Sequence, residues 1–131
     1  MSVADQLREM GLELPHPFSA GNYAPAVSAG DLVFFSGSGP QLPGGDFVTG
    51  RVGADVDVEQ AAEAARLCVL KLLGFVNSAP GFAEQPKVID GASELLISLF
   101  RDRGRHARSA VGMAELPFNI AVEVEMVVQA A

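Results

Sequence analysis

Cysteine is almost absent from this sequence, which contains one among 131 residues. A single cysteine excludes a disulfide within the chain, and Cys68 lies near the apolar stripe of a predicted helix, where we expect an ordinary core residue. The two histidines, His16 and His106, are far apart in the sequence and do not make the ligand set of a structural zinc site. We therefore expect no metal, and we expect His106 to flank the site around Arg108 described below.

Basic and aromatic residues are also scarce. Nine Lys and Arg stand against sixteen Asp and Glu, which gives a formal net charge of −7. Because neutralisation of phosphates dominates the affinity for nucleic acids, this charge argues against DNA or RNA as the main partner. The sequence has no tryptophan and one tyrosine, so a platform for stacking bases is not expected either.

Long apolar runs are missing. No run of eighteen apolar residues occurs, so we expect no membrane span. The opening stretch, MSVADQLREMGLELP, lacks the basic-then-apolar layout of a secretion signal, and a short amphipathic helix capped by Ser2 fits it better. We therefore expect a cytoplasmic protein in which residues 1–131 form a single domain, with residues 1–19 as an N-terminal extension.

Apolar residues make up 49% of the chain, and their spacing predicts several strands. The stretch APAVSAGDLVFFSG predicts two strands joined by a tight turn at Gly30–Asp31. The second strand is apolar on both faces, so we expect it to be covered on both sides. The segment SGSGPQLPGGDFVTGRVG predicts a loop with a short strand near Phe47–Val48. It lacks the Lys-Ser/Thr ending of a phosphate loop, so its glycines serve turns or let the backbone approach a small ligand.

Two helices are predicted in the middle of the chain. Asp57 caps the first, with Gln60 three positions later as in a capping box. The second begins near Pro86 and ends at RDRG, with cations and a glycine. Each helix has an apolar stripe that we assign to the core. The stripes consist of Val58, Ala61, Ala62, Ala65, Val69 and Leu72, and of Val88, Ala92, Leu95, Leu96 and Leu99.

Two further strands are predicted near the end of the sequence. Arg108 opens the first, and a guanidinium always keeps its charge and brings five donors, so it needs a partner there. In the second, VEVEMVV, Glu123 and Glu125 share one face, and valines with Met126 share the other. A solvated sheet face is the alternative interpretation of the two glutamates.

Four stretches together resemble a known family: GNYAPAV, FFSGSGPQLP, ARSAVGMAELP and VEVEMVV. They are similar to the motifs of the Rid family, the reactive intermediate deaminases, also called the YjgF family and formerly L-PSP endoribonucleases. The resemblance covers about residues 20 to 130, and Arg-Ser-x-Val followed by Leu-Pro is its most specific part. The N-terminal helix and GRHARSAVG are more like a longer subgroup whose activity is less settled.

The resemblance implies an α+β, chorismate-mutase-like fold, with a mixed β-sheet and two helices packed on one face. It also implies a homotrimer with ligand pockets in the clefts between subunits. Members hydrolyse enamines and imines of small 2-amino acids to 2-keto acids and ammonia without a cofactor. By this resemblance Arg108 holds a substrate carboxylate and Glu123 places the water. Tyr23, Ser36 and Gly37 match positions that line the pocket.

Alternatives remain open at this point. A non-catalytic trimer that binds small carboxylates or keto acids would keep Arg108 and would not require Glu123. Arg108 could also pair with Glu123 or Glu125 purely for stability. The ribonuclease suggested by the older family name fits the charge of −7 least. Asp90 stands where many members have asparagine, and we assign it no role.

The middle of the chain departs from the family pattern. Roughly twenty residues are absent there, the length of two helical turns plus a turn and a strand. Only GFVNS remains as a possible inner strand, and a missing inner strand would leave the backbone groups of its neighbours unpaired. We therefore predict that the chain from Leu72 to Phe75 is broken or tightly irregular.

Overall fold

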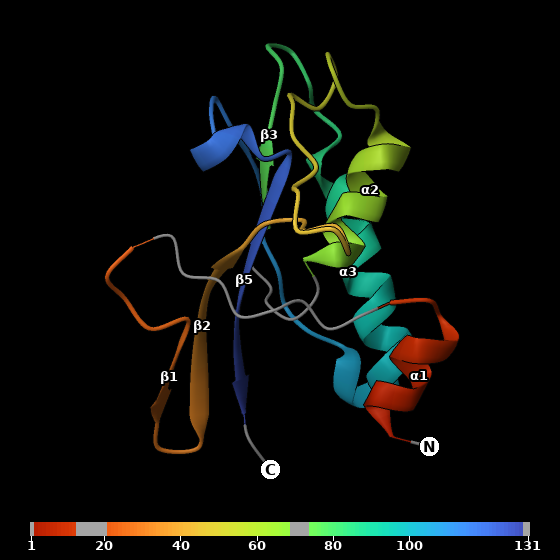
Figure 1. Ribbon diagram of the computed structural model, residues 1–131, viewed down its shortest axis with the longest axis vertical. Helices are drawn as coiled ribbons and strands as arrows, with labels where there is room; N and C mark the ends of the chain where they lie inside the picture. Colours follow the sequence, from red (N-terminus) through yellow and green to blue (C-terminus); the bar gives the residue numbers. More distant parts are fainter. Residues whose placement is uncertain (1, 13–20, 69–73, 130–131) are drawn as a thin grey trace.

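The computed structural model describes residues 2–12, 21–68 and 74–129. The strands are β1 (Ala26–Ala29), β2 (Leu32–Ser38), β3 (Gly74–Asn77), β4 (Ala110–Met113) and β5 (Val122–Gln129). The helices are α1 (Val3–Glu9), α2 (Val58–Leu67) and α3 (Gln85–Phe100), with short 3-10 helices η1 (Arg101–Gly104) and η2 (Pro117–Asn119). The strands form one sheet in the order β1-β2-β5-β3-β4, and α2 and α3 cover one of its faces (Figure 1). This is the expected α+β arrangement.

The sheet is mixed. β1, β2, β5 and β3 pair antiparallel in turn, whereas β3 and β4 pair parallel, with α3 as the connection between them. The predicted hairpin is confirmed: Ala29 pairs with Leu32, and Gly30 in the turn has a φ of 62°, which glycine adopts easily. β2 and β5 change register between Phe35 and Ser38. This irregularity includes Ser36 and Gly37, two of the predicted site residues.

Capping residues start α1 and α2 as predicted. The side chain of Ser2 accepts a hydrogen bond from the backbone of Asp5, and the carboxylate of Asp5 accepts one from the backbone of Ser2. The hydrogen bonds from Ser2 also lower the pKa of Asp5. Asp57 and Gln60 form the same reciprocal box at α2. These local signals fix the helix starts, because they satisfy backbone donors that no earlier turn can satisfy.

The core lies between the sheet and the helices. All five residues of the predicted stripe on α3 are buried, as are Ala61 and Ala65 of α2, whereas Val69 and Leu72 lie outside the described residues. Cys68 is a core residue, as expected, and its thiol lies 3.4 Å from the carbonyl oxygen of Ala64. In β5, Val122 and Val124 are fully buried, and the two glutamates alternate with them. β5 therefore turns its apolar face to the helices.

Three sequence-based predictions need correction. Phe47 and Thr49 make isolated bridges to Gln41 and Ile120 instead of a strand near Phe47–Val48, so that segment crosses its neighbours without a ladder. Arg108 lies two residues before β4 instead of opening it. We expected β2 to be covered on both sides, but in the single chain Phe34 is 46% exposed, because it pairs with Val127 on the sheet face opposite α2 and α3 (Figure 1).

The inner strand is present despite the shortened middle. The four residues of β3 pair with β5 on one side and with β4 on the other, so the backbone of the neighbouring strands finds partners. α2 ends at Leu67, and β3 begins at Gly74. Of the segment predicted to be broken or irregular, residues 72 and 73 lie outside the described residues, so the prediction stays untested there, whereas Gly74 and Phe75 belong to the regular strand β3.

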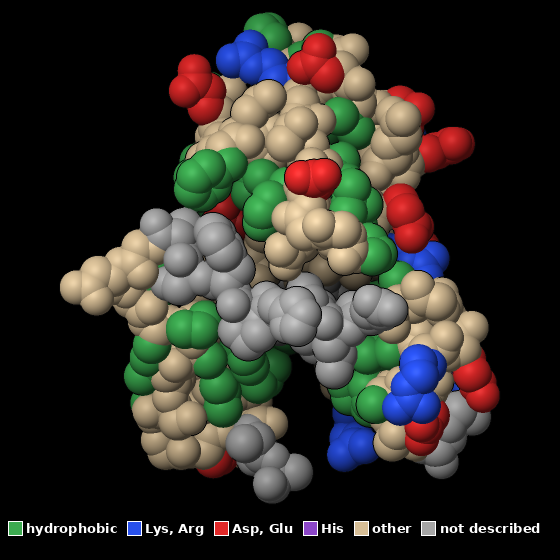
Figure 2. All heavy atoms as spheres, viewed as in Figure 1, with side chains coloured by type: hydrophobic (Ala, Val, Ile, Leu, Met, Phe, Trp, Pro, Cys, Tyr) green, Lys and Arg blue, Asp and Glu red, His purple; other side chains and the backbone are tan. Residues whose placement is uncertain are grey.

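The surface has a hollow beside the β1–β2 hairpin. Figure 2 shows it between the part of the surface formed by β1 and β2 and the part formed by α1, with hydrophobic side chains along its wall. Among the described residues, no helix is long and apolar enough to cross a membrane.

Candidate functional site

Arg108 is held by three groups of α3. Its Nη2 donates to Oδ1 of Asp90 at 2.6 Å and to the carbonyl oxygen of Pro86 at 3.2 Å, and its Nη1 donates to Oγ of Ser93 at 2.9 Å. The Arg108 side chain is 24% exposed and that of Asp90 is 50% exposed. A carboxylate thus already occupies the guanidinium. Within this chain the alternative pairing of Arg108 with Glu123 or Glu125 is not made, because Asp90 on α3 takes that place.

Ser93 connects Arg108 to His106. The Ser93 hydroxyl lies 3.0 Å from Nε2 of His106, and Nδ1 of the same ring lies 2.6 Å from the carbonyl oxygen of Gly104. That carbonyl can only accept, so Nδ1 carries a proton, and in the neutral ring Nε2 accepts from the hydroxyl. The hydroxyl oxygen then accepts from Arg108, and the hydrogen bonds run in one direction. His106 flanks the arginine, as the sequence suggested.

Glu123 lies against Gly37 on a different part of the sheet. A Cβ atom built on Gly37 would come within 1.9 Å of Oε1 of Glu123, so this glycine provides the space that the carboxylate occupies. The neighbouring Ser36 donates through its backbone and its hydroxyl to the carbonyl oxygen of Pro25. Tyr23, two residues before Pro25, is 48% exposed. Ser36 thus contacts the segment that contains Tyr23, and Gly37 contacts Glu123.

Arg108 and Glu123 lie on opposite faces of the sheet in one subunit. Val122 and Val124 are buried on the face that the helices cover, so Glu123 between them points to the other face. The hydrogen bonds that the Arg108 side chain makes with described residues go to α3, which lies on the helix-covered face (Figure 1). The single chain therefore does not bring these two predicted site residues together.

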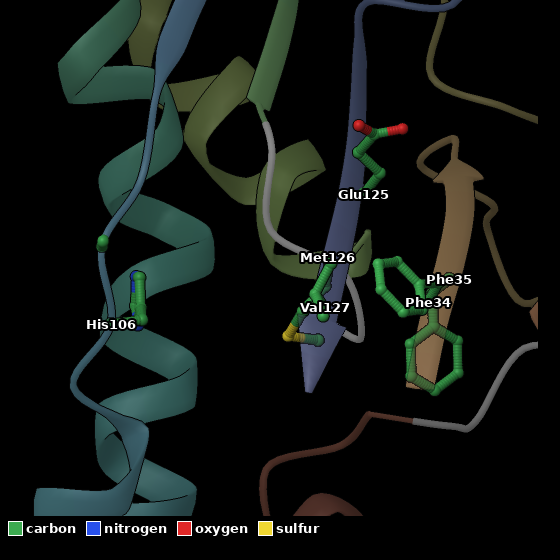
Figure 3. Close-up of a pocket in the computed structure, with 7 residues that line it drawn as sticks. Phe34, Phe35, His106, Glu125, Met126 and Val127 are labelled. Carbon is green, nitrogen blue, oxygen red and sulfur yellow. The ribbon is translucent and has the colours of Figure 1, made fainter. Parts of the chain in front are cut away.

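A pocket of about 430 Å³ lies near the arginine side of the site. Figure 3 shows His106 on one wall and Met126 with the rings of Phe34 and Phe35 on the other. The pocket is lined by Phe34, Phe35, His106, Ala107, Glu125, Met126 and Val127. None of the predicted site residues lines it, although Ala107 directly precedes Arg108. Its walls are mostly apolar, and His106 and Glu125 are the titratable side chains among the lining residues.

The described residues offer no site for a metal. No group of three or more His, Cys, Asp and Glu side chains in this part of the chain could hold an ion. The charged group that can bind an organic anion here is the guanidinium of Arg108 itself, because a guanidinium pairs with a planar carboxylate through two parallel hydrogen bonds. It already contacts the carboxylate of Asp90.

Sequence reasoning missed Asp90 and Ser93. Together with Pro86 they occupy positions i, i+4 and i+7 of α3, so they share one face of the helix. That spacing is visible in the sequence, but it does not show which distant segment the face meets. The contact depends on how the chain from Gly104 to β4 passes along α3, and no local pattern predicts it.

The comparison with protein families identifies the chain. The model of the family described as Endoribonuclease L-PSP matches residues 14–130. The chain belongs to this family. It is the family whose motifs the four stretches resembled, which confirms that resemblance and the fold it implied.

Three relatives show how close the similarity is. Protein TCP17 of Trypanosoma cruzi is 40% identical over 149 residues, covering 97% of this chain and 93% of that protein. A 2-iminobutanoate/2-iminopropanoate deaminase of Dermatophagoides farinae is 32% identical over 121 residues, covering 86% and 88%. A crystal structure of a protein of unknown function from Agrobacterium tumefaciens is 41% identical, has a TM-score of 0.88 and covers 98% and 94%.

The alignment with TCP17 also bears on the length of this chain. It spans 149 residues, whereas the whole chain has 131, so that relative carries residues that this chain lacks. This agrees with the departure from the family pattern seen in the sequence.

Proposed function

We propose that this protein is a Rid-like hydrolase that converts imines and enamines of small 2-amino acids into 2-keto acids and ammonia. The observation that carries the proposal is Arg108, a partly exposed guanidinium that already holds a carboxylate in place. A 2-imino acid presents the same planar group next to its reactive carbon. Similarity to the 2-iminobutanoate/2-iminopropanoate deaminase of Dermatophagoides farinae supports this substrate class.

The reaction needs a water molecule directed at the imine carbon. A carboxylate that accepts a proton from this water lowers the barrier by general-base catalysis. Glu123 fits this role, because its side chain lies across Gly37 on the sheet face that the helices leave open. Hydrolysis adds the water across the C=N bond, the nitrogen gains protons, and the C–N bond then breaks to release ammonia and the keto acid.

We place the site in a cleft between subunits. In one chain Arg108 and Glu123 lie on opposite sides of the sheet, so a single subunit cannot present both to one small molecule. A second copy can supply the missing half, with Arg108 from one subunit and Glu123, Gly37, Ser36 and Tyr23 from its neighbour. The homotrimer implied by the family resemblance provides three such clefts. Binding and positioning across the cleft then supply the proximity that catalysis requires.

Ammonia release tests this proposal directly. An amino-acid oxidase generates the imine in solution, and the protein is expected to speed the appearance of the keto acid above the spontaneous rate. Glu123→Gln should keep the binding of keto acids and slow hydrolysis by roughly a hundredfold or more, because it removes the base. Glu94→Gln, on the exposed side of α3, is the matched control and should hydrolyse at the rate of the parent.

Two results would reject the proposal in different ways. A protein that binds keto acids and never accelerates imine hydrolysis is a non-catalytic carboxylate-binding module. A protein that neither binds keto acids nor hydrolyses imines has a different function altogether.

A further inference from the structure

The guanidinium of Arg108 has little capacity left for a substrate. A carboxylate can take two parallel hydrogen bonds from either of two edges, Nε with Nη2 or Nη1 with Nη2. Both edges include Nη2, and the two hydrogens of Nη2 are already used, one by Asp90 and one by the carbonyl oxygen of Pro86. A bidentate ligand therefore has to displace one of these two partners.

Asp90 opposes the ligand in either case. If the ligand takes the place of Asp90, the ion pair at 2.6 Å must break first. If it takes the place of the Pro86 carbonyl, two carboxylates share one guanidinium and repel each other. The uncharged Pro86 carbonyl imposes no such repulsion. The cost of binding is therefore set mainly by the charge of Asp90.

The remaining contacts hold Arg108 in position while its partner changes. Nη1 stays bonded to Ser93, whose hydroxyl is fixed in turn by the ring of His106. Because this bond does not involve Nη2, it survives the exchange of Asp90 for a ligand. The guanidinium then keeps its place beside α3.

We propose that Asp90 is an internal competitor that occupies Arg108 until a ligand carboxylate replaces it, and that it selects for ligands able to bind both nitrogens. The inference rests on the proposed function, since it assumes that Arg108 binds a substrate carboxylate. Only molecules in which Arg108 has released Asp90 can bind the ligand carboxylate. The apparent Kd is therefore the intrinsic Kd divided by the fraction of such molecules. A ligand that forms one hydrogen bond gains less from displacing Asp90 than a carboxylate that forms two.

Calorimetry with pyruvate and 2-ketobutyrate tests this competition. Asp90→Asn keeps the shape of the side chain and removes its charge, so both keto acids should bind about three- to tenfold more tightly than to the parent, as expected when a partly exposed ion pair no longer competes. Asp90→Ala should also bind more tightly. Glu94→Gln removes one negative charge from the same helix, four residues further on, and should leave the affinity within twofold of the parent.

Two controls locate the effect. The double variant Asp90→Asn with Arg108→Ala should bind neither keto acid, because the gain in affinity depends on Arg108. Methyl pyruvate, which lacks the carboxylate, should gain nothing from Asp90→Asn. A gain that persists in the double variant, or that Glu94→Gln reproduces, would overturn the inference.

The failure of the competition is distinct from the failure of the proposed function. If Arg108→Ala loses binding while Asp90→Asn binds no better than the parent, the site is correct and Asp90 does not compete. If neither the parent nor Asp90→Asn binds a keto acid, the proposed site and the competition are both wrong.

Discussion

Within the described part of the chain, the side chain of Arg108 directs its hydrogen bonds to α3, although the proposed reaction places it in a cleft shared with another subunit. Its ion pair with Asp90 is partly exposed, and such a pair contributes roughly 0–1 kcal/mol to stability. The fold therefore does not depend on this arginine. Substituting Arg108 should therefore reduce ligand binding and leave the protein folded.

We predict that Arg108→Ala abolishes the binding of small keto acids and leaves the protein folded. The lost charge-assisted pair corresponds to about 3 kcal/mol, roughly a hundredfold in affinity. Arg108→Lys should restore binding only in part, because a point charge cannot reproduce the two parallel bonds. Calorimetry with pyruvate measures the affinity, and circular dichroism checks the fold. Unchanged affinity in Arg108→Ala would make the arginine structural and move the site elsewhere.

Gly37 gives a second prediction at this scale. In Gly37→Ala the new Cβ would lie 1.9 Å from Oε1 of Glu123, so the carboxylate has to move away. We expect imine hydrolysis to fall by at least tenfold through loss of the positioned base, with the binding of keto acids affected less. Gly44→Ala, where a Cβ meets nothing within 4 Å, is the control and should hydrolyse like the parent. Equal rates in the two variants would remove Glu123 from the reaction.

Sequence alone identified several residues of the candidate site but could not arrange them. Strand alternation placed Glu123 opposite the buried valines, because that depends on neighbouring residues only. The pairing of Arg108 with Asp90 joins residues eighteen positions apart through a contact between a helix and an irregular segment. The local pattern contains no information about such a contact, so Asp90 was given no role.

At the scale of elements, local signals worked best. The caps at Ser2 and Asp57 and the turn at Gly30–Asp31 involve residues at most three apart, and all three were predicted correctly. The segment around Phe47 failed because a strand needs a partner along its length, and here it meets only isolated ones. β3 forms an inner strand because it pairs with both β4 and β5, and the sequence of β3 does not show which strands it pairs with.

The packing of α2 on α3 depends on Gly91. A Cβ at this position would lie 2.0 Å from the backbone carbonyl oxygen of Ala62, so the two helices approach too closely for any side chain there. Gly→Ala inside a helix ordinarily stabilises by roughly 0.5–1 kcal/mol. We predict that Gly91→Ala instead lowers the free energy of unfolding by about 1–3 kcal/mol, measured by urea denaturation. Stabilisation by this substitution would show that the helices lie further apart.

For the whole molecule, the open face of the sheet is the main feature. Val27, Phe34 and Val127 are direct neighbours across three strands and are 58%, 46% and 55% exposed. A row of exposed apolar side chains of this kind is typical of a surface that contacts another protein. It lies on the same face as Glu123, where the proposed cleft needs a second subunit.

We predict a homotrimer in solution. Light scattering at micromolar concentration should give three times the chain mass of 13.7 kDa. Phe34→Lys places a charge in the middle of the apolar row and should dissociate the assembly, with loss of imine hydrolysis. Leu42→Lys, in an exposed loop position, should leave the mass unchanged. A monomeric mass for the parent would contradict both the trimer and the site between subunits.

The position of β5 in the sheet has a consequence for how the protein is made. β5 is the central strand, yet it follows all the other described strands in the chain. As the nascent chain leaves the ribosome from its N-terminus, the β1–β2 hairpin and the β3–α3–β4 unit emerge before the strand that joins them. Until Val122 and its successors are synthesised, β2 and β3 each expose an unpaired edge, which invites pairing with other chains. The interval between the synthesis of β4 and the synthesis of β5 is therefore when this protein is most open to aggregation.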